Sequence, residues 1–317
     1  MSSLINADTR HVFKQQAKLM GNQFELSAVT DDEGLAHNFI KAGIDEIKRI
    51  EQLLTTYRDD SETNLINKNA GIAPVQVSRE TFDLVERAQR ISAVTQGAFD
   101  LSYGSVDKQL WNFDTQAQSL PDKKTALKMV RLINYRNIVL DREQCTVFLR
   151  QKGMRIGFGG IGKGYAADRA KLVMKNMGCT SGVVNASGDL NAWGYQPGGK
   201  PWTIGIVNPN AANTAFSYMN VTDLAVATSG NYEKYIMVDG KKYSHTINPK
   251  TGLPVTGIKS VTIIAPHAEI ADAMATPVTI MGIEAGLYMI NQMNNIEAVL
   301  IDDNDRIYTS KKIRITH

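Results

Sequence analysis

Three separated segments of this chain combine glycine, hydroxyl, histidine and acidic residues in spacings that suit chemistry on a phosphorylated ligand. They are Gly157–Asp168 (GFGGIGKGYAAD), Thr228–Glu233 followed by Ser244–Gly252 (SHTINPKTG), and Ala271–Thr276 (ADAMAT). The first supplies flexible backbone and a cation, the second a histidine, and the third a carboxylate and a hydroxyl. Together they predict a phosphate-binding loop, an acid or base, and a site for a hard metal ion.

The glycine segment, up to Lys163, follows a predicted strand at Met154–Gly157 and precedes a predicted helix at Ala166–Met177. Residues without side chains let backbone N–H groups approach a pyrophosphate, and a helix N-terminus adds a favourable dipole. The segment matches neither the P-loop nor the dinucleotide-binding pattern. A tight turn packed against its neighbours is therefore the alternative, with Lys163 either neutralising phosphate or solvated.

His245 is the best placed of the five histidines, because it ends a predicted strand and faces the turn Asn248–Gly252. An imidazole in this position can bond a phosphate or act as a general base near neutral pH. The alternative is a histidine whose nitrogens are satisfied by local backbone groups.

Asp272 and Thr276 are expected on one side of a helix at Ala268–Met281, which Pro277 is expected to interrupt. With a backbone carbonyl from the glycine segment they form an all-oxygen ligand set, which suits Mg²⁺. The alternative is an acidic residue near a helix start and a hydroxyl bonded to its own backbone.

Two further residues are of interest for binding a flat, polar ligand. Asp100, within Gly97–Ser102, is expected at a helix-to-strand corner, and Tyr57 offers an aromatic face after a long helix. Each has a purely structural alternative.

Hydrophobic periodicity predicts the elements that must position these residues. Further helices are expected at Leu35–Thr56, Arg79–Thr95 behind the N-cap Ser78, and Asp122–Ile133, and further strands at Phe24–Val29, Ile138–Asp141, Thr146–Arg150, Val183–Ala186, Trp202–Val207, Tyr235–Val238, Lys242–Ile247, Ser260–Ile264, Ile296–Ile301 and Arg306–Thr309. Arg58–Gly71 is polar and turn-rich. This order predicts one α+β domain over residues 1–317, helix-rich to about residue 135 and β-rich from about residue 136.

Composition excludes several classes of protein. The net charge of +3 is too small to indicate nucleic-acid binding, and two cysteines make no disulfide framework. No run of 18 apolar residues exists, and the first residues resemble no signal peptide or lipobox. We therefore expect a cytoplasmic protein. The alternative is a periplasmic or membrane-anchored protein whose leader has been removed.

Across these segments the chain resembles the ApbE-type flavin transferases, which are FAD:protein FMN transferases. The matching segments, in chain order, are Leu19–Phe24, Tyr57–Glu62 with Asn64–Asn67, Gly97–Asp100, Gly160–Tyr165 with Asp168, Asn185–Asp189, Ala227–Gly230, Ser244–His245 with Asn248–Pro249 and Thr251–Gly252, and Ala271–Thr276. The resemblance implies an ApbE-like, T-fold-related α+β fold of mixed sheets and packed helices. It also implies a magnesium-dependent enzyme that cleaves FAD, attaches FMN to a Thr or Ser of another protein, and releases AMP.

The same resemblance implies roles for individual residues. Asp272, Thr276 and the backbone of Gly160 would hold Mg²⁺ on the FAD pyrophosphate, and His245 or a carboxylate near the metal would accept the acceptor's proton. The residues implied to contact FAD are Met20, Tyr57, Ala98, Phe99, Asp100, Lys163 and His245. Many family members have Asp where this chain has Gly157, so one FAD-binding carboxylate is missing.

The resemblance further implies a partner, an acceptor subunit of a redox-driven ion pump or of a flavin-dependent reductase. The chain lacks the acceptor sequence Asp-x-x-Ser/Thr-Gly-Ala-Thr, so self-flavinylation is not expected. Two other functions use the same site. One is an FAD pyrophosphatase that gives FMN and AMP, and the other is a non-catalytic FAD-binding protein.

Overall fold

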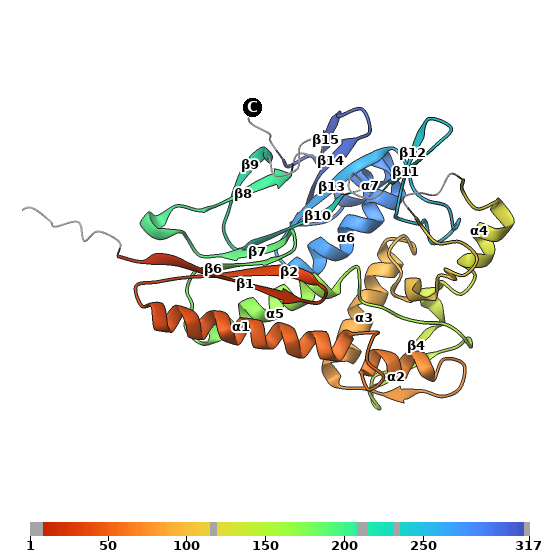
Figure 1. Cartoon of the computed structure of the whole chain (residues 1–317), viewed down its shortest axis with the longest axis horizontal. Helices are drawn as coiled ribbons and strands as arrows, with labels where there is room; N and C mark the ends of the chain where they lie inside the picture. Colours follow the sequence, from red (N-terminus) through yellow and green to blue (C-terminus); the bar gives the residue numbers. More distant parts are fainter. Residues whose placement is uncertain (1–8, 115–118, 208–214, 231–234, 314–317) are drawn as a thin grey trace, which may run out of the picture.

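The computed structural model describes residues 9–114, 119–207, 215–230 and 235–313. Within these residues, an eight-stranded antiparallel sheet crosses the middle of the molecule (Figure 1). Its strands, in spatial order, are β1 (His11–Leu19), β2 (Asn22–Thr30), β6 (Gly182–Ala186), β7 (Asp189–Trp193), β10 (Leu224–Gly230), β13 (Ile258–Ala265), β14 (Glu297–Asp302) and β15 (Ile307–Thr309). The sheet thus joins a hairpin from the start of the chain to strands from its second half.

The remaining elements surround this sheet. The smaller strands are β3 (Val75–Gln76), β5 (Thr146–Leu149) and β4 (Ile138–Asp141) in one sheet, with the hairpins β8 (Trp202–Val207)–β9 (Ala215–Val221) and β11 (Tyr235–Val238)–β12 (Lys241–Ser244). The helices are α1 (Glu33–Leu54), α2 (Glu62–Lys68), α3 (Arg79–Val94), α4 (Lys123–Met129), α5 (Gly162–Asn176), α6 (Ala268–Met281) and α7 (Ile283–Ile290). None of the described helices has the length and apolarity needed to cross a membrane.

The two faces of the large sheet are covered differently. Helices α1, α5 and α6 lie on one face, and the hairpin β8–β9 lies on the other (Figure 1). Along β10 the side chains alternate, so Ala225 and Ala227 pack in the core with the helices whereas Val226 packs with Trp202 and Ile204. A helix layer on one face of an antiparallel sheet is the expected α+β arrangement.

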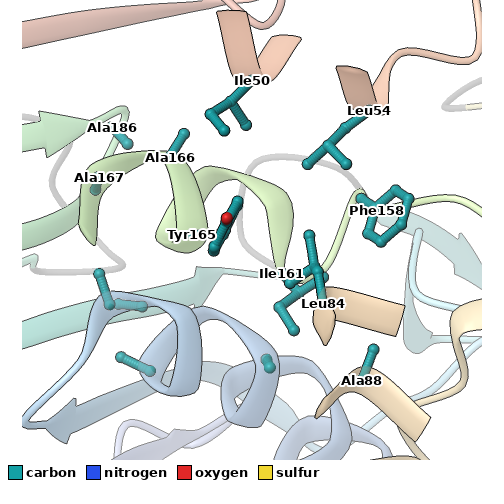
Figure 2. Packing of buried hydrophobic residues seen from close by; sticks show 14 of the residues in the cluster. Ile50, Leu54, Leu84, Ala88, Phe158, Ile161, Tyr165, Ala166, Ala167 and Ala186 are labelled. Atoms are coloured by element: carbon teal, nitrogen blue, oxygen red, sulfur yellow. The ribbon is translucent and has the colours of Figure 1, made fainter. Parts of the chain in front are cut away.

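Helix α1 forms where the apolar residues recur at helical spacing. The Asp32 side chain accepts the Leu35 N–H at 2.8 Å and caps the first turn. Ile50 and Leu54 at the other end are buried near Phe158 and Tyr165 (Figure 2). The helix therefore helps to fix the segment that leads into α5.

The structure corrects several predicted elements. Met154–Gly157 is not a strand, and the helix predicted at Asp122–Ile133 spans only Lys123–Met129. The helix predicted from Ala166 begins at Gly162, because the Gly162 N–H already bonds the Phe158 carbonyl at 2.6 Å. The glycine segment therefore forms the first turn of α5 as well as the loop before it.

Three predictions near the predicted site residues also need correction. Pro277 does not interrupt α6, which continues to Met281, because proline removes a single N–H and the helix is buried on both sides of it. Asp100 does not begin a strand but caps the 3₁₀ helix η1 (Leu101–Ser105). Strand β12 ends at Ser244, so His245 follows the strand and is not part of it.

A cluster of charged side chains joins α1, α3 and α5. Arg49 donates hydrogen bonds to Glu46 and to Glu80 at 2.7–2.9 Å. Arg169 donates to Glu46 at 3.0 Å, and the Tyr165 hydroxyl donates to Glu80 at 2.6 Å. The hydrogen bonds from Arg49, ahead of the other causes, hold the pKa values of both glutamates below their usual range.

We expect this cluster to stabilise the fold above about pH 4.3, the usual pKa of an unfolded glutamate. Because the folded pKa values are lower, the stabilisation is lost as the pH falls through them. The free energy of unfolding in urea, measured from about pH 7 to about pH 3, should therefore fall more steeply for the wild type than for Arg49→Leu. Equal slopes would contradict this account.

Candidate active site

The three predicted segments meet in one cavity of about 330 Å³ at an end of the large sheet. The lining residues are Asn22, Gly159, Gly160, Lys163, Ser187, Asp189, Thr228, Ser229, Gly230, His245, Asp272, Ala275 and Thr276. The structure thus brings together Gly160, Lys163, His245, Asp272 and Thr276, as the sequence predicted. The rest of the Thr228–Glu233 segment lies outside the described residues.

The contact between α5 and α6 positions the loop and the carboxylate. The Asp168 carboxylate, on α5, accepts the N–H groups of Ala268 and Glu269 at 2.9 and 3.0 Å and so caps α6. In the other direction, the Gly164 N–H donates to Asp272 Oδ2 at 3.0 Å. Each helix therefore satisfies backbone N–H groups in the first turn of the other.

A lysine and two carboxylates form the charged floor of the cavity. Lys163 Nζ donates to the buried Asp189 carboxylate and lies 3.6 Å from Asp272 Oδ1. Burial first, and then the charge of Asp272, raise the pKa of Asp189 above its usual range. Burial alone would lower the pKa of Lys163, but the charges of Asp272 and Asp189 raise it overall. The ammonium therefore stays protonated at neutral pH.

The donor groups fit a hard divalent cation. The Asp272 carboxylate, the Thr276 hydroxyl one helical turn later, and the backbone of Gly160 all border the same cavity. The described residues contain no cluster of three or more His, Cys, Asp or Glu side chains that could hold a metal ion. The protein therefore offers a partial oxygen shell, of the kind that Mg²⁺ completes with water and substrate phosphates.

His245 lies at the open side of the cavity. Its side chain is exposed, and its ring meets the edge of the Phe113 ring with centroids 6.2 Å apart. It follows directly after β12, which pairs with β11 as a hairpin. An imidazole placed between solvent and the cavity can exchange a proton with an entering group.

The other residues implied to contact FAD do not line this cavity. Tyr57 is 97% exposed, whereas Ala98 and Phe99 are buried. The Phe99 ring lies beside the loop, 3.5 Å from the position that a Cβ on Gly160 would take. Met20 lies next to the cavity residue Asn22, whose side-chain amide donates to the Met20 carbonyl at 2.9 Å. Their contact with FAD stays a prediction.

Asp100 has a structural role in this conformation. Its carboxylate accepts the Ser102 N–H at 2.8 Å, the Ser102 hydroxyl at 2.6 Å and the Tyr135 N–H at 2.8 Å. Burial is the largest influence and raises the pKa of Asp100. The residue also borders a second cavity of about 400 Å³, which is separate from the cavity described above. A role for Asp100 in binding FAD stays a prediction.

Several lining residues had no individual role predicted from the sequence, among them Asn22, Ser187, Asp189, Ser229 and Gly230. Asn22 begins β2 and Ser187 lies in the β6–β7 turn, whereas Asp189 begins β7 and Ser229 and Gly230 end β10. All five stand in the segments Leu19–Phe24, Asn185–Asp189 and Ala227–Gly230, which resemble the family in sequence but were assigned no residue role. Only the sheet order shows that these segments converge.

Comparison with known proteins shows the family of this chain. The model of the ApbE family matches residues 20–300. An FAD:protein FMN transferase of Klebsiella pneumoniae is 33% identical over 306 residues, covering 96% of this chain and 93% of that protein. A protein of the same name from Treponema pallidum is 30% identical, covering 86% of this chain and 81% of that protein.

Solved structures of the same family share the fold. The ApbE protein of Thermotoga maritima has a TM-score of 0.84 at 28% identity, covering 95% of this chain and 97% of that one. The flavinyl transferase ApbE of Pseudomonas stutzeri, in its apo form, has a TM-score of 0.81 at 26% identity, covering 95% and 94%. The α+β fold class is confirmed, and this chain belongs to the ApbE family.

Proposed function

We propose that this chain transfers FMN from FAD to a threonine or serine hydroxyl of an acceptor protein and releases AMP. The two relatives compared above carry the name FAD:protein FMN transferase, and this chain matches most of the length of each. The observation that carries the proposal is the convergence of Gly160, Lys163, His245, Asp272 and Thr276 on one cavity. By family resemblance the acceptor is a subunit of an ion pump or of a reductase.

In this proposal Asp272, Thr276 and the Gly160 carbonyl hold Mg²⁺. The ion would draw charge from the pyrophosphate and make its phosphorus more electrophilic. The Lys163 ammonium lies within reach of both cavity carboxylates and adds positive charge beside the phosphates. The exposed backbone of Gly159 gives the phosphates access to the loop before α5.

The reaction balances as one displacement at phosphorus. The acceptor hydroxyl oxygen bonds the phosphorus of the FMN half, the bond from that phosphorus to the bridging oxygen breaks, and AMP leaves with the electron pair. We assign the hydroxyl proton to His245, because this imidazole lies at the open side of the cavity. Asp189 is already engaged by Lys163 and by the Thr228 N–H.

One incubation separates the candidate functions. The protein is mixed with FAD, Mg²⁺ and an acceptor domain, and the products are separated by denaturing electrophoresis and chromatography. Flavin fluorescence that stays with the acceptor supports transfer. Free FMN and AMP without labelled acceptor would assign a pyrophosphatase, and intact FAD would assign a binding protein. Chelation of Mg²⁺ should stop either reaction.

Gly157→Asp should strengthen FAD binding. A Cβ at Gly157 would meet no atom within 4 Å, and the Gly157 N–H donates to the Leu101 carbonyl at 3.1 Å, so the backbone has room for a side chain to begin here. One added hydrogen bond from a charged group corresponds to roughly a tenfold gain in affinity. Titration by flavin fluorescence measures the dissociation constant, with Gly157→Ala as the uncharged control. An equal gain in both variants would argue against the carboxylate.

A further inference from the structure

Strand β10 has an edge that opens into the cavity. On one side it pairs with β13 from Ala225 to Gly230. On the other side, among the described residues, its pairing with β7 covers only Leu224 to Val226. The last three residues, Thr228, Ser229 and Gly230, line the cavity instead. The sheet therefore presents a short edge of backbone beside the predicted metal residues.

The backbone groups on this edge can be assigned from the alternation of a strand. The Thr228 N–H donates to Asp189, which begins β7, so Thr228 points its backbone groups toward the β7 side. Two residues later, Gly230 points the same way. Among the described residues, the Thr228 carbonyl and the two Gly230 backbone groups form no hydrogen bond on this side. These three backbone groups are therefore available to pair with an added strand.

Side chains on this edge point in a known direction. Ala225 and Ala227 face the helices, so by alternation Ser229 also faces α6, where Asp272 and Thr276 stand. A residue placed opposite Ser229 on an added strand would direct its side chain to the same face. That side chain would then lie over the predicted metal site.

We propose that an extended segment of the acceptor protein adds to this edge of β10 as an antiparallel strand, with its acceptor hydroxyl residue opposite Ser229. The inference rests on the proposed function, which requires a polypeptide hydroxyl to reach the cavity. An exposed strand edge recognises a peptide through main-chain hydrogen bonds. All neighbours within the described sheet are antiparallel, which sets the expected direction.

The register makes a position-specific expectation. Ser229 directs its own backbone groups to β13, so the acceptor residue opposite it would direct its N–H away from β10. The residues immediately before and after the acceptor residue would instead donate their N–H groups to the carbonyls of Thr228 and Gly230. The acceptor residue itself would contribute only its side chain.

Synthetic acceptor peptides with single N-methyl groups test this register. Methylation of either neighbour of the acceptor threonine should lower kcat/KM for transfer at least about tenfold. Methylation of the acceptor threonine itself should lower it less than about threefold. If the unmodified peptide receives FMN but the three methylated peptides behave alike, the docking is wrong. If the unmodified peptide receives none, the proposed function fails instead.

A pair of variants locates the edge on the enzyme. Gly230→Pro removes the N–H that Gly230→Ala keeps. The ratio of the two variants' KM values for the peptide therefore isolates the contribution of this N–H. The KM for the peptide should be at least about tenfold higher in the proline variant, with the KM for FAD within about twofold between the two. A change confined to the KM for FAD would assign the edge to the nucleotide and overturn the docking. If the proline variant does not fold, the peptide series decides alone.

Discussion

Asp272→Ala is expected to abolish both transfer of FMN and hydrolysis of FAD. The carboxylate borders the cavity, and it also accepts the Gly164 N–H at 3.0 Å, so the change removes a metal ligand and loosens the loop. Residues that only support a metal ligand already affect activity by roughly 10- to 100-fold, so the loss should exceed about 100-fold. AMP release, followed by chromatography at increasing Mg²⁺, measures it.

The isosteric variant Asp272→Asn separates the two roles of this side chain. An amide oxygen still accepts the Gly164 N–H, but it lacks the charge that binds a divalent ion. Asp272→Asn should therefore keep the wild-type melting temperature and still need far more Mg²⁺. Full activity in the alanine variant at ordinary Mg²⁺ would remove Asp272 from the site.

Gly164→Ala is expected to disrupt the fold and the site together. A Cβ at this position would lie 2.1 Å from the Ala268 carbonyl oxygen and 2.8 Å from Asp272 Cβ. Backbone cannot yield as a flexible side chain does, so α6 must move, at a cost of about 3 kcal/mol or more. We expect a melting temperature lower by roughly 5 °C or more, with activity lost even where the protein remains folded.

The matched control is Gly157→Ala in the same segment, where a Cβ would meet no atom within 4 Å. That variant should melt within about 2 °C of the wild type. If Gly164→Ala also melted within about 2 °C of the wild type and stayed active, the close approach of α5 and α6 would be wrong.

Long amphipathic elements were predictable because they carry their own signals. The helix predicted at Arg79–Thr95 appears as α3, and the Ser78 side chain accepts the Thr81 N–H at 3.2 Å, as expected of an N-cap. The strand at Ile138–Asp141 has the predicted bounds. In α3 the helical periodicity of the apolar residues matches the buried face.

Strand β10 was not predicted, because its conformation depends on contacts with other elements and not on a pattern in its own sequence. Ala227–Gly230 consists of small and polar residues that show no alternation of polarity and fit a loop equally well. Pairing with β13 and packing under α6 make the segment a strand. Helix α2 was missed in the polar stretch Arg58–Gly71 because its 7 residues are too few to show a helical periodicity, although Ser61 caps it.

The site was predictable in its residue types and only partly in its assembly. Gly160, Asp272 and Thr276 were chosen for their oxygen donors, and the fold brings them together. Asp189 was not predicted as a site residue, because it contacts Lys163 only in the folded chain and the two residues are far apart in sequence. The roles of these residues in binding metal and FAD stay predictions, and so do the FAD contacts of Met20 and Tyr57.

The pairing of β2 with β6 constrains how this protein is made. Phe24 lies opposite Ala186, so a strand that leaves the ribosome early waits for one synthesised much later. Until then the β2 edge is open to other chains, and the late helix α6 must still emerge before any ligand is held. Such distant pairings slow folding, so we expect the large sheet to be completed only after its last strands have been made.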